Sequence, residues 1–279
     1  MSYGKRHEFG FAGLALLRNW LVGKKDVEES ILEEISRLVQ ENNEAKSSTK
    51  ITNLNVSKGY TKWADTYDTI PNLLIDVEEP VVQSIIKAFP RGKALDAACG
   101  TGRYSQYLQS LGFTVTGLDI SSSMLAHAKK RCKDTVAFLQ GDVTSIPLKD
   151  NSVHLAVCAL ALTHFQNLTI PLSELARVVM KGNHIIISDI HPWLVALGGQ
   201  AEFFDGSGNH CYINNYIHWH SSYMKSFAQL GLKVVDCIEP VLEKKHLETA
   251  SFGIDLSKNT ISSALMGLPI SLIWVLEKN

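Results

Sequence analysis

The segment Ala94-Leu-Asp-Ala-Ala-Cys-Gly-Thr-Gly102 decides the fold of this chain. Its first half is a short apolar run, which predicts a buried β-strand, and its second half is a turn with two glycines. A helix is expected to follow, over residues 103–111. Because glycine has no Cβ atom, the backbone of such a turn can approach a ligand closely, and the helix start offers free N–H groups. A glycine pair between a strand and a helix is also common as a plain tight turn, so this segment alone indicates a nucleotide only weakly.

Short apolar runs and helical segments of about ten residues alternate on both sides of this loop. Helices are expected at residues 76–89, 121–132, 171–179 and 222–230, and strands at 114–118, 136–139, 153–160, 184–190, 233–238 and 272–276. This alternation is typical of a parallel sheet that helices cover on both faces. We therefore predict a doubly wound α/β fold.

Two further carboxylates follow the next two expected strands. Asp119 ends the second strand, roughly 20 residues after Asp96, the offset at which an acid binds ribose hydroxyls in nucleotide-binding α/β folds. Asp142 ends the third strand, where it could accept a hydrogen bond from an adenine amino group. Each acid alone is more often a helix cap or a loop residue. Together they lie at successive strand ends, which form the ligand crevice of an open α/β sheet.

A nicotinamide cofactor is the alternative to consider for this crevice, and its fingerprint is G-x-G-x-x-G. Here Gly100 and Gly102 are followed by Ser105 at the place of a third glycine or alanine, and an acid precedes the first glycine. This spacing favours S-adenosylmethionine (SAM) over NAD.

These motifs, in this order, resemble those of the class I SAM-dependent methyltransferases, in particular the small-molecule branch that includes the ubiquinone/menaquinone-biosynthesis methyltransferases. The resemblance covers roughly residues 57–190. The matching segments are Tyr60-Thr-Lys-Trp63-Ala-Asp-Thr-Tyr67-Asp68, Ala94 to Gly102, Gly117-Leu-Asp119-Ile-Ser121 with Met124-Leu125, Gly141-Asp142-Val143 with Ile146-Pro147, and Val157-Cys-Ala-Leu-Ala-Leu162. Two departures are His154, where the family usually has Asp, and Met180-Lys-Gly-Asn183, where it usually has Lys-Pro-Gly-Gly.

The resemblance implies a Rossmann-like, seven-stranded, mostly parallel sheet with an antiparallel last strand, and SAM as the cofactor with S-adenosyl-L-homocysteine as the product. It implies that residues 51–279 form the methyltransferase domain, while residues 1–50 form an N-terminal helical extension and linker. By position it assigns cofactor binding to Tyr60, Trp63, Tyr67, Asp96, Ala97, Cys99, Gly100, Gly102, Asp119, Ile120, Met124, Gly141, Asp142, Val143, Ala159 and Leu160.

Histidine is concentrated in the second half of the chain, where residues 154–220 hold seven of the ten histidines. His164 and His191 follow two expected strands at the crevice edge. We expect His191 to be the general base and His164 to be the second candidate, although a structural hydrogen-bonding role is about equally common. The residues expected to bind the acceptor are His164, His191, Trp193, Tyr212, His218, Trp219 and Tyr223.

Residues 191–223 are rich in histidine and aromatic side chains and predict a substrate lid over an apolar or aromatic pocket, with a locally packed loop as the alternative. No spacing such as H-E-x-x-H occurs, so no metal site is expected.

Composition narrows the class of protein further. The 279 residues are 45% hydrophobic and 20% charged with a net charge of −1, which is typical of a globular protein and gives no footprint of nucleic-acid binding. No apolar run approaches the length of a membrane span, no signal-peptide pattern occurs, and the five cysteines are scattered like the thiols of a cytoplasmic protein.

We therefore predict a cytoplasmic SAM-dependent methyltransferase. It would methylate an oxygen or carbon of a small acceptor, an apolar or aromatic compound or a secondary metabolite, by in-line displacement. The N-terminal helices would allow a homodimer. The alternative function is a SAM-binding protein that does not methylate, either a SAM-dependent isomerase or cyclase or a regulatory partner of another enzyme.

Overall fold

The computed structural model describes the chain except for residues 1–2, 21–22, 45–50, 134 and 250–254. Its contacts divide the chain into two compact units. The helical unit is formed by Met1–Ile51, Pro71–Val77 and Val241–Pro269, and the sheet unit by Thr52–Ile70, Glu78–Pro240 and Ile270–Asn279. Within the described residues, no helix combines the length and the apolar composition that crossing a membrane requires.

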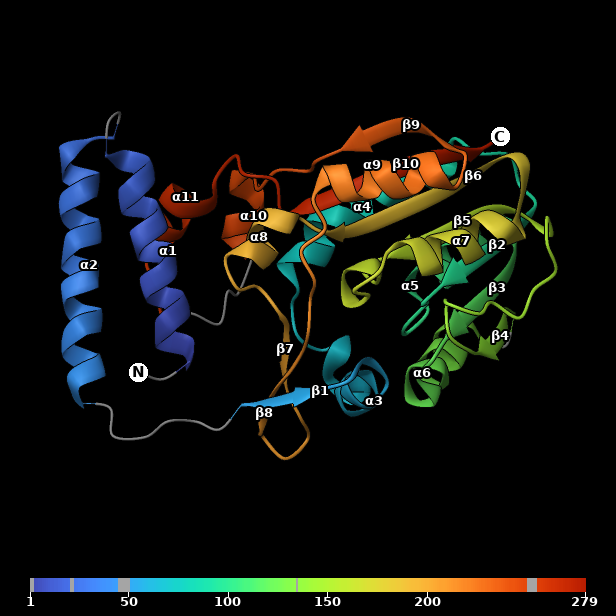
Figure 1. Ribbon diagram of the computed structural model, residues 1–279. Helices are drawn as coiled ribbons and strands as arrows, with labels where there is room; N and C mark the ends of the chain where they lie inside the picture. The colour runs from blue at the N-terminus through green and yellow to red at the C-terminus, as the bar shows by residue number, and fades with distance from the viewer. Residues whose placement is uncertain (1–2, 21–22, 45–50, 134, 250–254) are drawn as a thin grey trace. The chain divides into compact units, whose positions relative to one another are not determined.

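A seven-stranded sheet forms the centre of the sheet unit, with the strand order β4-β3-β2-β5-β6-β10-β9 (Figure 1). The strands are β2 (Lys93–Ala97), β3 (Thr114–Asp119), β4 (Ala137–Gln140), β5 (Val153–Ala159), β6 (Val179–Ile190), β9 (Leu232–Ile238) and β10 (Ser271–Lys278). Neighbours from β4 to β6 pair in parallel, and β10 runs antiparallel to both β6 and β9. The expected doubly wound sheet with an antiparallel last strand is confirmed.

Helices cover both faces of this sheet, which is why its central strands are apolar along their whole length. The helices are α4 (Leu73–Lys87), α5 (Arg103–Ser110), α6 (Ser122–Cys132), α7 (Thr169–Val178) and α9 (His220–Gln229). On one face, side chains of α4, α5 and α6 pack on the sheet around the fully buried Ile86 and Leu108. On the other face, α7 and α9 contribute Leu172 and Phe227. Each such side chain stabilises the fold by about 1.5–3 kcal/mol through burial.

The boundaries of the expected strands and helices agree with the structure to within about three residues, except at the start of β6. Ser121 caps α6 as expected, since its hydroxyl accepts from the backbone N–H of Met124 at 3.3 Å. The strand expected from residue 184 begins earlier, at Val179. The expected start was wrong because Val179 pairs with Val153 of β5, and the register then shifts so that His184 pairs with Leu155.

A second, three-stranded sheet in the sheet unit joins two distant parts of the sequence. It has the order β1-β8-β7 and contains β1 (Thr52–Leu54), β7 (Ala201–Phe204) and β8 (His210–Ile213). β1 pairs in parallel with β8, and β7 pairs antiparallel to it. Most of the insertion at residues 191–223 is therefore ordered by this hairpin and by the short helix α8 (Pro192–Ala196).

The helix α3 (Val56–Tyr67) follows β1 directly and carries the aromatic segment that precedes the core. Asn55 caps it by accepting from the N–H of Lys58 at 2.9 Å. Trp63 of α3 stacks on Phe203 of β7, with ring centroids 4.8 Å apart. This contact holds α3 against the three-stranded sheet.

The helical unit contains α1 (Tyr3–Asn19), α2 (Lys25–Glu44), α10 (Lys244–Thr249) and α11 (Lys258–Leu265). The guanidinium of Arg18 donates to the carbonyls of Ala264 and Met266 at 2.8 and 2.9 Å, at the carboxyl end of α11. Glu34 of α2 accepts from the hydroxyl of Thr260. The N-terminal helices therefore pack with α11, whose residues were expected to belong to the methyltransferase domain. Most of the expected linker, residues 45–50, lies outside the described residues.

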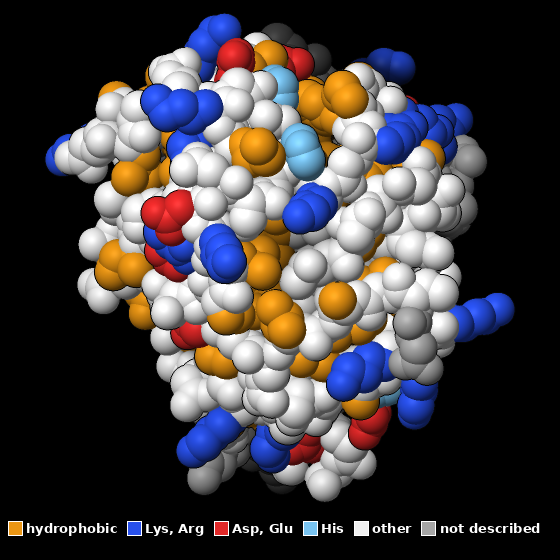
Figure 2. Space-filling model, turned by 90° about the vertical axis from the view of Figure 1, so that its right-hand side faces the viewer, with side chains coloured by type: hydrophobic (Ala, Val, Ile, Leu, Met, Phe, Trp, Pro, Cys, Tyr) orange, Lys and Arg blue, Asp and Glu red, His pale blue; other side chains and the backbone are white. Residues whose placement is uncertain are grey.

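Figure 2 shows one face of the molecule, on which hydrophobic side chains gather toward the middle and Lys and Arg side chains are spread among and around them. Scattered charge and some exposed apolar surface are ordinary for a globular protein. This face by itself identifies no ligand.

Candidate functional site

A partly enclosed cavity lies at the carboxyl ends of β2, β3, β4 and β5. Its empty space, with the open mouth included, is about 800 Å³. It is lined by Val56, Tyr60, Tyr67, Ala98, Gly100, Asp119, Ile120, Met124, Gly141, Asp142, Val143, Ala159, Leu160, Ala161, His164 and Phe165. These residues come from α3, from the start of α6, and from the end of each of the four strands and the loop after it.

The two glycines of the loop after β2 serve different purposes. Both have left-handed backbones, with φ of 53° at Gly100 and 81° at Gly102. A Cβ atom at Gly100 would meet nothing within 4 Å, so the space beside this residue is open toward the cavity. A Cβ atom at Gly102 would lie 3.0 Å from the Cβ of Ala128, so Gly102 allows α5 and α6 to pack closely.

Two residues other than glycine at the cavity also adopt a left-handed backbone. Ala98 after β2 has a φ of 56°, and Leu160 after β5 has a φ of 54°. Such a conformation costs of order 1–2 kcal/mol and tends to occur where the surrounding structure imposes it, often at functional sites. β2 and β5 are neighbouring strands, so both strained residues lie at one edge of the sheet.

Asp119 presents its carboxylate at the cavity from the end of β3. One oxygen accepts from the N–H of Gly100 and the other from the N–H of Ser121, both at 2.8 Å. Burial raises the pKa of this carboxyl, and the backbone hydrogen bonds oppose the rise. Each oxygen keeps a lone pair, which could accept from a ribose hydroxyl.

Asp96 lies behind the loop and does not line the cavity. Its carboxylate accepts from the hydroxyl of Ser105 at 2.6 Å, and only 2% of the residue is exposed. Burial raises the pKa of Asp96 to about 7. Asp96 thus connects β2 to α5.

The other predicted cofactor residues outside the cavity lining are Trp63, Ala97, Cys99 and Gly102.

Tyr60 and His164 form a hydrogen-bonded pair at the cavity. The hydroxyl of Tyr60 lies 2.8 Å from Nε2 of His164, and Nδ1 of the same ring lies 2.9 Å from the carbonyl oxygen of Asn214. A carbonyl can only accept, so Nδ1 carries the ring proton and Nε2 accepts from Tyr60. Burial lowers the pKa of His164 and raises that of Tyr60, so both groups are neutral near pH 7.

The other residues predicted to bind the acceptor lie outside the cavity lining. Nε2 of His191 lies 2.9 Å from the carboxylate of Glu239, and Nε2 of His218 lies 2.7 Å from the carbonyl oxygen of Phe165. The buried Tyr223 donates to Asp189 at 2.5 Å. Tyr212 belongs to β8, Trp193 to α8, and Trp219 is 48% exposed. Of the predicted set, the structure therefore brings only His164 to the cavity.

The sequence analysis did not name four lining residues, which are Val56, Ala98, Ala161 and Phe165. Ala98 lies inside the quoted loop, so it could have been named with its neighbours. Phe165 directly follows His164, so extending that motif by one residue would have found it. Val56 lies at the start of α3, far from the core motifs, and carries no local signal.

The chemistry of the cavity fits SAM. Asp119 could hold the ribose, and Asp142 with Ile120 and Val143 could hold the adenine ring. The open space beside Gly100 and the start of α5 suit the amino-acid end of the ligand. The rings of Tyr60 and Tyr67 and the nearby carboxylates favour a cationic sulfonium.

Comparison with known proteins agrees with this fit. Residues 95–187 match the family described as "Methyltransferase domain". The chain is 34% identical to a malonyl-[acyl-carrier protein] O-methyltransferase of Yersinia pestis over 146 residues, 52% of this chain and 54% of that protein. It is 32% identical to a demethylmenaquinone methyltransferase of Renibacterium salmoninarum over 113 residues, 40% of this chain and 47% of that protein. The chain spans about half the length of the curated relatives it matches.

A solved structure shares the fold. It is a SAM-dependent methyltransferase from Mesorhizobium loti, with a TM-score of 0.57 at 17% identity over 74% of this chain and 100% of that one. The sheet order, the cavity at the strand ends and the matched residues agree with one another. Residues 95–187 therefore match the methyltransferase-domain family, and the chain has the fold of a SAM-dependent methyltransferase.

Proposed function

We propose that this chain transfers the methyl group of SAM to an oxygen, or to an activated carbon, of a small acceptor that binds beside Tyr60 and His164. The observation that carries the proposal is the hydrogen-bonded pair itself. Tyr60 and His164 both line the cavity, and their contact at 2.8 Å joins residues 104 positions apart in the sequence.

The pair supplies a route for the acceptor proton. The phenol oxygen of Tyr60 keeps lone pairs that can accept a hydrogen bond from an acceptor hydroxyl, while its own proton is directed at Nε2 of His164. A proton taken from the acceptor would move to Tyr60, and the proton of Tyr60 would move to His164. His164 is then the base and Tyr60 relays the proton.

Charge in the cavity supports this route. Bound SAM supplies the methyl group together with one positive charge, and both leave the sulfur in the transfer. A proton gained by His164 restores a positive charge to the same enclosed space. The neutral resting state of His164, which burial favours, keeps the ring from carrying a second positive charge beforehand.

The lining also supports an acceptor with apolar or aromatic character. Val56, Tyr67, Ala161 and Phe165 contribute apolar surface, and the described lining residues include no Lys or Arg that could pair with an anionic acceptor. We therefore favour a phenol, an enol or a similar weakly acidic group over a carboxylate. A cytoplasmic location is part of the same proposal.

A carboxylate acceptor is the second candidate, and sequence similarity favours it. The Yersinia pestis relative is named for methylation of a malonyl group on acyl-carrier protein. A carboxylate has no proton to lose at neutral pH, so His164 would have no proton to receive. Tyr60 would then only donate a hydrogen bond to the acceptor.

The experiment that tests the proposal measures release of S-adenosyl-L-homocysteine with a panel of phenols, enolisable compounds and carboxylic acids. For a hydroxyl acceptor, Tyr60→Phe should lower kcat by roughly a hundredfold, because the proton relay is lost. For a carboxylate acceptor, the same variant should raise KM by roughly tenfold and change kcat little, because one hydrogen bond is lost.

Tyr67→Phe is the matched control, since Tyr67 lines the same cavity on the same helix and Tyr60 is the tyrosine that contacts His164. Equal losses in both variants would remove the relay role from Tyr60. Tight binding of SAM without any release of S-adenosyl-L-homocysteine would instead favour the non-methylating alternative.

A further inference from the structure

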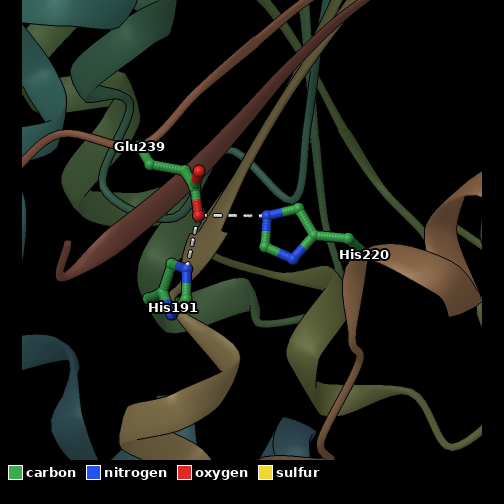
Figure 3. A group of neighbouring side chains, drawn as sticks. All are labelled: His191, His220 and Glu239. Atoms are coloured by element: carbon green, nitrogen blue, oxygen red, sulfur yellow. Dashed lines mark hydrogen bonds and ion pairs between the residues drawn. The ribbon is translucent and has the colours of Figure 1, made fainter.

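A group of three metal-ligating side chains lies outside the cavity lining, at the other end of the sheet edge. His191, His220 and Glu239 each offer one ligand atom, and these atoms all lie within 4.8 Å of one another. Figure 3 shows both imidazole rings directed at the same carboxylate oxygen of Glu239. We propose that His191, His220 and Glu239 bind a divalent transition-metal ion such as Zn²⁺.

Three separate elements of the sheet unit position these ligands. His191 directly follows β6, Glu239 directly follows β9, and His220 is the first residue of α9. β6 and β9 lie on either side of β10 and both run antiparallel to it, so their carboxyl ends lie at the same edge. No local spacing in the sequence could reveal the group, because its members come from three elements.

The backbone holds two of the ligands at a fixed separation. The N–H of His191 donates to the carbonyl of Ile270 at 3.0 Å, and the N–H of Ile270 donates to the carbonyl of Pro240 at 3.1 Å. Ile270 thus connects His191 with the residue next to Glu239. Such a scaffold keeps the ligands together before an ion binds, which lowers the cost of binding.

The distances suit a metal ion. Nε2 of His191 and Nε2 of His220 lie 2.9 and 3.1 Å from the same oxygen of Glu239. Tetrahedral ligands around an ion with bonds of about 2.1 Å are about 3.4 Å apart, which is close to both separations. One ion could therefore reach all three atoms after small side-chain rotations.

The ligand types select the kind of ion. Two imidazoles and one carboxylate suit Zn²⁺ and its first-row neighbours, and they are a poor match for Mg²⁺ or Ca²⁺, which prefer oxygen ligands. The side chain of His191 is 8% exposed, whereas those of His220 and Glu239 are 38% and 44% exposed. Water could complete the coordination from this open side.

One hydrogen bond must change when an ion binds. Nδ1 of His191 accepts from the N–H of Trp193, which places the ring proton on Nε2, the atom that would ligate the ion. This hydrogen bond is long, at 3.4 Å, and therefore weak, so little stabilising free energy is lost when the proton moves to Nδ1.

The test is a Zn²⁺ titration of the full chain after removal of metals with a chelator, by competition with a chromogenic chelator. The proposal expects one Zn²⁺ per chain. His220→Asn and Glu239→Gln should each weaken Zn²⁺ binding by roughly a hundredfold, because a ligand is lost. Both side chains are partly exposed, so the variants are expected to fold, and their melting temperatures without metal check this.

Two control variants remove potential ligands from elsewhere. His210 lies 3.3 Å from Glu202, and among the described residues this pair belongs to no group of three metal-ligating side chains. Cys237 is an exposed thiol close in sequence to Glu239. His210→Asn and Cys237→Ser should keep the Zn²⁺ affinity within threefold. The proposal is overturned if the wild type binds less than one Zn²⁺ per chain, if the ligand variants bind as tightly as the wild type, or if only a control variant loses binding.

Discussion

Two histidines follow neighbouring parallel strands at one edge of the sheet, and their surroundings give them opposite properties. His164 follows β5, lines the cavity and contacts Tyr60, whereas His191 follows β6 and contacts Glu239 outside the cavity lining. In His164 the carbonyl of Asn214 fixes the proton on Nδ1 and leaves a lone pair on Nε2. In His191 the reverse holds, because Nδ1 is the acceptor.

The comparison shows that position along a strand does not decide what a histidine does. Both residues meet the same sequence criterion, a histidine after an apolar strand. The segments packed over them decide the tautomer: residue 214 follows β8 and supplies a carbonyl to His164, while α8 supplies the N–H of Trp193 to His191. A lone pair on Nε2 makes a base, and a proton on Nε2 makes a donor to a carboxylate.

The largest expected difference is in turnover. With a hydroxyl acceptor and no added metal, His164→Asn should lower kcat by roughly a hundredfold or more, because the base is lost. His191→Asn should lower kcat less than tenfold. Initial rates of S-adenosyl-L-homocysteine release under saturating SAM measure both. A greater loss in His191→Asn would reverse the comparison and restore His191 as the base.

The pH profile supplies an independent check on the same comparison. The pKa of His164 is lowered from 6.5 by burial, and its neutral form is the active base. Activity should therefore be constant above the lowered pKa and fall as the pH drops through it, with an acid limb below 6.5. Tyr60, the titratable group in contact with His164, stays protonated over this range because burial raises its pKa. The variant His191→Asn should show the same fall in activity at low pH as the wild type.

A smaller effect should separate two acids of neighbouring strands. Asp119→Asn should raise the Kd for SAM by roughly tenfold to a hundredfold, because hydrogen bonds to a charged acceptor are lost. Asp96→Asn is the matched control, since Asp96 lies in the neighbouring strand β2 and does not line the cavity. It should change the Kd less than threefold. Calorimetric titration of each variant with SAM measures the difference, and equal losses would place Asp96 in the cofactor site.

The sheet and its cavity edge were predictable from the sequence because their signals are local. A strand, a glycine turn and an acid at the next strand end lie within about 25 residues of one another, as the doubly wound fold requires. The contacts that Tyr60, His164 and His191 make were not predictable in the same way. Tyr60 and His164 lie 104 residues apart, and His191 and Glu239 lie 48 apart, so only folding brings each pair together.

Asp96 shows a second limit of the sequence motif. Its position in β2 matched the family pattern, but its carboxylate accepts from the hydroxyl of Ser105 in α5 and does not line the cavity. A motif gives the place of a residue along the backbone. The direction of its side chain depends on which partner lies within reach.

The smallest expected effect concerns backbone strain, which also differs between the two parts of the edge. At the cavity, Ala98 has a φ of 56°, whereas His191 after β6 has an ordinary φ of −62°. Ala98→Gly relieves about 1–2 kcal/mol of strain and loses about 0.5–1 kcal/mol through the greater freedom of the unfolded chain. The variant should therefore be more stable by about 0.5–1 kcal/mol, a rise of roughly 1–3 °C in Tm.

Ala97→Gly, one residue earlier in the buried strand β2, relieves no such strain and should lower the Tm. Calorimetric melting of both variants compares them directly. If Ala98→Gly lowered the Tm as much as Ala97→Gly does, the left-handed conformation at the cavity would carry no strain, and the contrast between the two parts of the edge would rest on the histidines alone.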